Sequence, residues 1–284
     1  MKTGLVMEGG ALRTIFSAGV TDGFLERGIC FPYMIGVSAG IAYGVSYLSG
    51  QFGRNLKILT EYAPDPRYMG ARNMLLPGNR HCYFGLKFTY DEIPKKLVPF
   101  DYEACARSET ECEGVVTDLE TGNAVYLPFD PYEKDMKMLQ ATCAMPLLFP
   151  IYEIGGMKCM DGGVADAIPW RRALEKGCDR VVALPTKERG YVRKTESVQK
   201  LIDIRYRRYP KFVDAMRRRA DVYNEDREAL FRLEKEGRAL IFCPDSIEGF
   251  SRIERDTEKI RALWAEGHRK ALERENEVRD FLKG

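Results

Sequence analysis

The sequence predicts an α/β fold built on a mainly parallel sheet, and three consecutive patterns near the start support this prediction. Residues 4–7 form a short apolar run that ends at Gly9-Gly10, which is typical of a buried strand entering a tight turn. Residues 13–27 carry an aromatic or aliphatic residue every fourth position, which indicates a helix. Residues 29–37 return to a strand pattern. A strand, helix and strand within about 36 residues have the length of a right-handed crossover between parallel strands.

The rest of the chain continues this alternation. Residues 51–100 are irregular and rich in proline and aromatic residues, so we expect a helix, a loop and a cover over the site. The other predicted elements are helices at 39–49, 132–144, 169–176, 195–236 and 260–282, hairpins at 114–127 and 151–160, and strands at 181–184 and 239–243. The composition changes after Pro185. We therefore expect a core over residues 1–185 and a mostly helical extension over residues 186–284 that packs on the same domain.

Composition and charge exclude several classes of protein. The chain has 44 Lys and Arg against 42 Asp and Glu, so no global charge favours nucleic acid. Eight scattered cysteines without a C-x-x-C pair indicate reduced, mostly buried thiols such as Cys30 and Cys243, not a disulfide framework or a zinc site. No apolar run approaches the roughly 18 to 20 residues of a membrane span. We expect a cytoplasmic protein whose membrane contact is peripheral.

A candidate nucleophile lies at Ser38, within the G-x-S-x-G sequence of residues 36–40. In such an elbow the serine occupies a strained turn between a strand and a helix, and Gly36 and Gly40 avoid collisions there. The motif also occurs by chance, as a turn between a strand and a helix of small residues. A serine hydroxyl is a weak nucleophile until a base removes its proton, so the base decides the class of enzyme.

Asp161 is the best candidate for that base. A triad of the α/β-hydrolase type needs a histidine late in the chain, but His81 falls in an irregular segment and His268 on a charged helix. Ser38 also comes too early for that fold. Asp161 follows a predicted strand, and Gly162 and Gly163 allow a sharp turn close to the site. A turn aspartate without chemistry is the alternative.

The first glycine turn is the candidate oxyanion hole. Backbone N–H groups of Gly9, Gly10 and Ala11 would stabilise a tetrahedral oxyanion by roughly 3 to 4 kcal/mol per donor. Arg13 either holds this loop or adds positive potential, with a solvent-facing side chain as the alternative. The parallel crossover places this loop and Ser38 at the same carboxyl edge of the sheet, where α/β proteins bind ligands.

Together these motifs resemble those of patatin-like phospholipases of the bacterial cytosolic branch. The resemblance covers roughly residues 4–185 and rests on residues 8–13, residues 36–40 and Asp161-Gly162-Gly163, with further similarity over residues 143–150 and 161–169. It implies a three-layer α/β/α fold, a Ser38–Asp161 dyad, and hydrolysis of phospholipids or related lipid esters through an acyl-enzyme, with no metal or other cofactor.

Two positions depart from the family's G-x-G-x-x-G loop. The chain has Ala11 and Thr14 where that loop has glycine, and a positive φ at Ala11 would be strained. A non-catalytic protein that binds lipids or acyl groups is therefore an alternative to the hydrolase. A Ser-His-Asp esterase or thioesterase is a further alternative.

Residues 205–219 carry seven basic residues against one acidic residue, interleaved with Tyr206, Tyr209, Phe212 and Met216. This pattern is typical of a segment that rests on an anionic membrane surface. A solvated helix with an inward apolar stripe is the alternative.

Overall fold

The structure, a computed structural model, describes residues 1–195 and 197–284. Across these residues it contains an eight-stranded sheet in the order β5-β6-β3-β2-β1-β7-β8, with β4 paired to β3. The strands are β1 Thr3–Met7, β2 Tyr33–Val37, β3 Glu111–Asp118, β4 Ala124–Pro128, β5 Tyr152–Ile154, β6 Met157–Asp161, β7 Arg180–Leu184 and β8 Ala239–Ile241. The neighbours from β3 to β8 are parallel, while β4, β5 and β6 form the antiparallel pairs.

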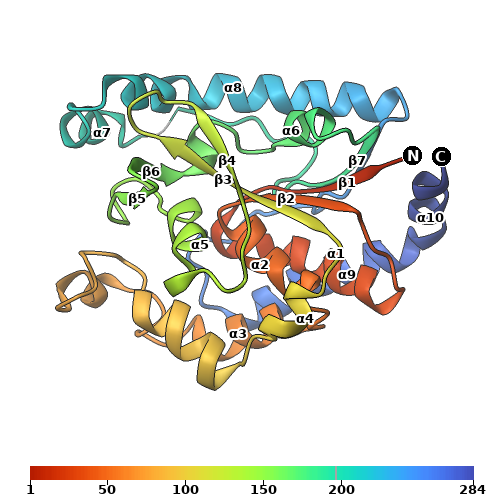
Figure 1. Cartoon of the computed structure of the whole chain (residues 1–284), viewed down its shortest axis with the longest axis horizontal. Helices are drawn as coiled ribbons and strands as arrows, with labels where there is room; N and C mark the ends of the chain where they lie inside the picture. Colours follow the sequence, from red (N-terminus) through yellow and green to blue (C-terminus); the bar gives the residue numbers. More distant parts are fainter. Residues whose placement is uncertain (196) are drawn as a thin grey trace.

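Helices cover both faces of this sheet (Figure 1). On one face lie α6 and α8, and on the other lie α1, α2 and α9, with α3 and α4 outside them. The α-helices are α1 Ile15–Glu26, α2 Ala39–Leu48, α3 Arg54–Tyr62, α4 Tyr102–Ala106, α5 Lys137–Thr142, α6 Trp170–Glu175, α7 Gln199–Arg205, α8 Pro210–Lys235, α9 Thr257–Glu273 and α10 Glu275–Lys283. Shorter or irregular helices are η1 Ala11–Thr14, η2 Ala71–Leu75, the π-helix η3 Phe88–Leu97, η4 Lys134–Met136 and η5 Gly162–Val164. The predicted α/β fold is confirmed.

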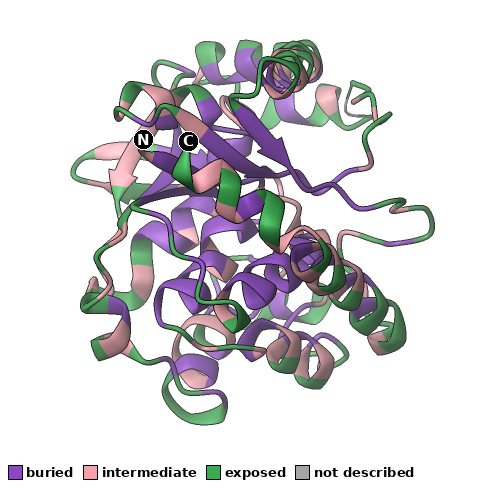
Figure 2. Ribbon diagram, turned by 90° about the vertical axis from the view of Figure 1, so that its right-hand side faces the viewer, coloured by how far each residue is buried: buried purple, intermediate pink, exposed green. Residues whose placement is uncertain are grey.

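The two faces of the sheet belong to two hydrophobic clusters. Within β1, Leu5 and Met7 pack with the α1 side of the molecule, whereas Val6 packs with Trp170 of α6 and Leu230 of α8. All five residues of β1 are buried, as expected for a parallel strand covered on both faces. Figure 2 shows this buried sheet between helices whose outer surfaces are exposed.

Several predicted elements differ in detail from those observed. The segment 132–144 is helical mainly over α5, because Asp135 and Met136 have positive φ angles of 61° and 49°. The predicted helix over 195–236 is two helices, and Pro210 occupies the first turn of the second. The long terminal helix also breaks, at Arg274, into α9 and α10. Cys30, which we expected to be buried, is exposed.

No helix in the described part of the chain is both long enough and apolar enough to cross a bilayer.

Candidate active site

Ser38 occupies a strained turn between β2 and α2. Its φ and ψ angles are 54° and −129°, a combination that L-residues rarely adopt. The turn is held by a relay in which the Ser38 N–H donates to Thr142 Oγ1 (2.9 Å) and the Thr142 hydroxyl donates to the carbonyl of Val115 (2.5 Å). Gly36 is required on steric grounds, since a Cβ there would lie 2.5 Å from the backbone nitrogen of Ile41.

The register of β3 brings Asp161 to Ser38. Val37, the last residue of β2, pairs with Val115 on one side of β3, and Asp161, the last residue of β6, pairs with Val116 on the other. The two strand ends are therefore separated by two strand spacings, roughly 10 Å between backbones, which two facing side chains can bridge. Both side chains line one polar cavity, and the nearby Ser38 hydroxyl acts to lower the pKa of the Asp161 carboxyl.

Asp161 is buried in an environment that favours its protonated form. Burial raises the pKa of this carboxyl above its ordinary value of 3.8. The positive charge of Arg219, the Gly163 N–H, the nearby Ser38 hydroxyl and the positive charge of Arg193 oppose that rise. The Gly163 N–H donates to Asp161 Oδ1 at 2.8 Å. The result is a carboxylate of raised basicity with a fixed orientation, which suits a general base.

The loop after β1 lies at the same edge of the sheet and is anchored by Glu8. The two carboxylate oxygens of this buried residue accept from the Thr186 N–H (2.7 Å) and the Tyr223 hydroxyl (2.9 Å). Among the described residues, no acceptor takes the N–H groups of Gly9, Gly10 and Ala11. These three donors are available to an oxyanion near Ser38.

Ala11 has a φ of 51°, the positive value expected at a position where the family's loop has glycine. The left-handed conformation costs a non-glycine residue roughly 1 to 2 kcal/mol. Arg13 turns away from the loop, and its Nε and Nη2 donate to the carbonyl of Phe250 at 3.1 and 2.8 Å. This contact anchors the helix that follows the loop, and the positive charge of Arg13 also acts to lower the pKa of Lys187.

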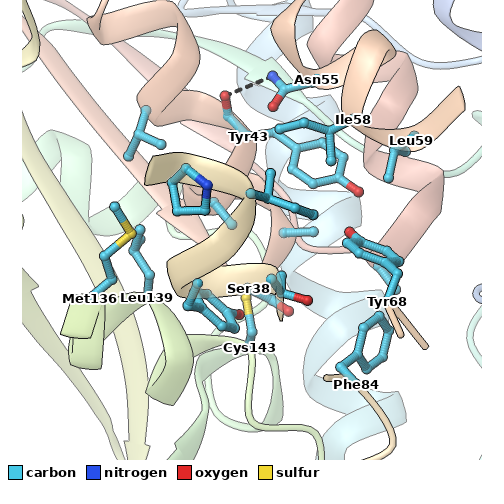
Figure 3. Close-up of a pocket in the computed structure, with 18 of the residues that line it drawn as sticks. Ser38, Tyr43, Asn55, Ile58, Leu59, Tyr68, Phe84, Met136, Leu139 and Cys143 are labelled. Carbon is cyan, nitrogen blue, oxygen red and sulfur yellow. Dashed lines mark hydrogen bonds between the residues drawn. The ribbon is translucent and has the colours of Figure 1, made fainter. Parts of the chain in front are cut away.

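An apolar cavity of about 130 Å³ opens on one side of Ser38. Aromatic and aliphatic side chains line it, from α2 (Tyr43), α3 (Ile58, Leu59), the π-helix η3 (Tyr90, Ile93), α5 (Leu139) and the connecting segments (Tyr68, Phe84, Phe100). In Figure 3, Ser38 and Cys143 lie at one end of this cavity, with Tyr68 and Phe84 beside them. A cavity of this composition suits an acyl chain whose carbonyl carbon reaches Ser38.

A second cavity, of about 40 Å³, lies on the other side of Ser38 and is polar. Ser38, Ala11 and Met145 line both cavities. The second is also lined by Gly9, Gly10, Asp161 and several charged or phenolic side chains, namely Glu8, Lys187, Tyr191, Arg193, Arg219, Tyr223 and Arg252. A candidate nucleophile, base and oxyanion loop thus meet between an apolar and a polar compartment.

Comparison with known proteins gives the family. The family model for patatin-like phospholipases matches residues 5–174, more than half of the chain. The chain belongs to this family. Lipid acyl hydrolysis is the activity general to patatin-like phospholipases. A second family model, a domain of unknown function (DUF6363), matches residues 209–283.

Two individual proteins are similar to this patatin-like chain. The uncharacterized protein YjjU of Escherichia coli (strain K12) is 24% identical over 196 residues, which are 64% of this chain and 51% of YjjU. The chain thus spans about half the length of this curated relative. The crystal structure of VipD from Legionella pneumophila superposes with a TM-score of 0.49 and 12% identity, covering 96% of this chain and 66% of VipD.

Several residues around the patatin-like motifs were not predicted from the sequence. Thr142 supports the elbow, and Cys143 contacts both Ser38 and Tyr90. Burial raises the pKa of the Cys143 thiol to about 12, so the thiol is neutral. Lys187 follows β7, which is parallel to β1. The rule that ligands bind at the carboxyl ends of parallel strands could have identified Lys187.

Neither histidine lies near Ser38. His81 is in the loop after η2, where its Nδ1 lies 3.2 Å from the carbonyl of Met74. His268 is on α9, stacked on Trp264 and 2.8 Å from Glu26. Neither side chain lines the two cavities. The geometry therefore does not support a Ser-His-Asp triad.

The segment 205–219 differs from the pattern that suggested membrane contact. Tyr206, Phe212 and Met216 are 2%, 0% and 3% exposed, so they form part of the core and cannot insert into a bilayer. Arg219 turns inward, and its Nε donates to the carbonyl of Gly163 at 2.7 Å. The other basic residues remain exposed, namely Arg205, Arg207, Arg208, Lys211, Arg217 and Arg218.

Proposed function

We propose that the chain is a serine acyl hydrolase that cleaves phospholipids or related lipid esters through a Ser38–Asp161 dyad. The placement of Ser38 and Asp161 together on the polar cavity, with Ser38 also lining the apolar cavity, is the observation that carries this proposal. Asp161 accepts the hydroxyl proton as Ser38 Oγ attacks the ester carbonyl carbon. The N–H groups of Gly9, Gly10 and Ala11 donate to the resulting oxyanion.

The intermediate then collapses to an acyl-enzyme. The bond between the carbonyl carbon and the alcohol oxygen breaks, and Asp161 returns its proton to that oxygen, so a neutral alcohol leaves. Water next attacks the acyl-Ser38 carbonyl and transfers a proton to Asp161. Collapse of this second intermediate releases a fatty acid and restores the Ser38 hydroxyl. Every proton moves between Ser38, Asp161, the alcohol and water.

The dyad is tested by two substitutions. Ser38→Ala removes the nucleophile, and Asp161→Asn removes the base, so each should lower hydrolysis of a p-nitrophenyl acyl ester by roughly 10³-fold or more. Circular dichroism should remain that of the unchanged protein. The matched controls Ser246→Ala and Asp280→Asn alter exposed residues and should retain full activity. Unchanged turnover in either dyad variant would contradict the proposal.

A non-catalytic lipid-binding protein is the second candidate, and the left-handed Ala11 in the oxyanion loop favours it. A fluorophosphonate probe separates the two, because only a serine activated by a base reacts with it. Peptide mapping should find the label on Ser38 in the unchanged protein and on no residue in Ser38→Ala. A protein that binds lipid but takes up no label would support the second candidate.

We also propose that the enzyme is cytoplasmic and makes peripheral contact with anionic membranes. The exposed basic side chains of residues 205–218 support it, together with Leu201 and Ile204 of α7, which are 53% and 65% exposed.

A further inference from the structure

The polar cavity beside Ser38 contains a buried lysine, Lys187. The Lys187 side chain is 5% exposed, and it lines this cavity. Among the residues that the structure describes, no carboxylate or hydrogen-bond acceptor contacts its ammonium group. The ammonium nitrogen lies 5.7 Å from the centroid of the Tyr191 ring. A buried ammonium normally requires an anionic partner, because desolvation otherwise disfavours its charge.

Other positive charges surround Lys187. Arg193, Arg219 and Arg252 line the same cavity. Asn224 fixes the backbone of Arg193 to α8 by two hydrogen bonds of 2.8 and 3.0 Å, and the guanidinium lies 4.6 Å from the centroid of the Tyr223 ring. The Arg193 Nε is buried and has no hydrogen-bond partner in the described structure.

Two acidic groups, Glu8 and Asp161, line the same cavity. Glu8 faces it, but its oxygens accept from Thr186 and Tyr223 instead of Lys187. Asp161 also faces it, where its Oδ1 accepts from the Gly163 N–H and the positive charges of Arg219 and Arg193 act to lower its pKa. Burial, followed by repulsion from Arg13, Arg252 and Arg193, lowers the pKa of Lys187 to about 7, with Glu8 opposing the change. The cavity thus presents hydrogen-bond donors and positive charge, and among the described residues neither of its two carboxylates accepts a hydrogen bond from Lys187.

The position of this cavity relates it to the reaction. Since the acyl chain of an ester would fill the apolar cavity and its carbonyl would lie at Ser38, the alcohol half would extend into the polar cavity. Its volume of about 40 Å³ exceeds the roughly 10 to 15 Å³ that one water requires, which leaves room for a small polar group. A cationic extension such as choline would be repelled by Lys187 and Arg193.

We propose that this cavity binds a phosphate group on the alcohol half of the ester, so that the substrates are lipid esters with a small anionic head group. This inference rests on the proposed hydrolase function. Lys187 and Arg193 are the specificity residues, since both would donate charge-assisted hydrogen bonds to the phosphate oxygens.

The kinetic test compares two monomeric substrates that differ only in charge, 1-octanoyl-glycerol 3-phosphate and 1-octanoylglycerol. We expect kcat/KM to be roughly tenfold higher or more for the phosphate ester, as loss of an interaction between charged groups commonly has this size. In Lys187→Met and Arg193→Gln the ratio of the two kcat/KM values should fall by a similar factor, mainly through KM. Lys235→Met, an exposed lysine at the end of α8, is the control and should leave the ratio unchanged. Equal losses on both substrates would overturn the proposal.

A binding test separates a head-group site from a site for free phosphate. Inorganic phosphate, glycerol 3-phosphate and 1-octanoyl-glycerol 3-phosphate are titrated into Ser38→Ala by calorimetry, so that none is turned over. The acylated ligand should bind most tightly, by roughly tenfold or more, because its chain also fills the apolar cavity. Adding Lys187→Met should weaken all three. Equal affinity for the three ligands, or no effect of Lys187→Met, would overturn the assignment.

The two tests also distinguish this inference from the hydrolase function itself. If the protein cleaves neither lipid nor a p-nitrophenyl ester, the hydrolase function fails, while calorimetry still decides whether the cavity binds phosphate. If it cleaves both lipids equally well, the hydrolase function stands and the head-group site is wrong.

Discussion

Asp161 links the chemistry of the site to pH. A general base acts only in its ionised form, and burial places the pKa of this carboxyl above 3.8. We therefore expect kcat/KM for a neutral p-nitrophenyl ester to fall about tenfold per pH unit below that raised pKa. A pH–rate profile between acid and neutral conditions measures this limb. A rate that stays constant down to the ordinary carboxyl pKa would contradict the role of Asp161.

The raised pKa of Asp161 also affects the stability of the fold. A higher pH favours activity but lowers this stability. Between 3.8 and the raised pKa, folded Asp161 holds a proton that the unfolded chain has lost, so stability falls as pH rises through this window. Asp161→Asn removes the buried charge. At neutral pH the variant should unfold at the same temperature as the unchanged protein or at a higher one. A lower unfolding temperature would therefore show that activity was lost through misfolding.

The sequence predicted Ser38 and Asp161 because each is embedded in glycines that a sharp turn requires. Arg193 carries no such local pattern, and the one local signal for Lys187 is its position shortly after the predicted strand 181–184. Their place in the site depends on the pairing of β1 with β7 and on the contact between residue 193 and α8, which are long-range features. A single sequence indicates which strands are buried but not which of them become neighbours.

At the scale of elements, α7 and the start of α8 form the candidate membrane surface. We predict flotation with phosphatidylglycerol vesicles at low salt and release at high salt, because each surface basic residue contributes about 1 kcal/mol that salt screens. Combining Arg207→Glu with Arg208→Glu should abolish flotation. Arg232→Glu with Lys235→Glu, at the other end of α8, is the control. Flotation that persists at high salt would contradict an electrostatic contact.

Element boundaries were predictable only where local chemistry fixes them. Gly28 with a φ of 61° follows α1, and the turns of both hairpins contain left-handed glycines at Gly122, Gly155 and Gly156. The break between α9 and α10 at Arg274 has no such signal. Arg274 Nη1 donates to the carbonyl of Ile241 in β8 at 2.8 Å, so this break coincides with a tertiary contact that periodicity cannot reveal.

At the scale of the molecule, we predict that residues 1–185 do not fold alone. β8 extends the sheet beside β7, α8 covers one hydrophobic cluster, and α9 packs on α1. The contact with α1 is so close that a Cβ on Gly267 would collide with the carbonyl of Phe16. A chain ending at residue 185 should therefore lack a cooperative thermal transition and bind a hydrophobic dye.

The full chain, unfolded under the same conditions, is the control for this truncation. If residues 1–185 unfold cooperatively at a similar temperature, the core is autonomous and the extension is an accessory.

The hydrogen bonds of Glu8 to Thr186 and Tyr223 join two parts of the chain with separate tasks. Ser38, Asp161 and the oxyanion loop lie within residues 5–174, whereas Lys187, Arg193 and Arg219 all come from beyond them. Under the proposed mechanism, bond cleavage and choice of leaving group are thus encoded in different stretches of sequence. Substitutions after residue 174 could redirect such an enzyme toward another alcohol while its reacting groups stay the same.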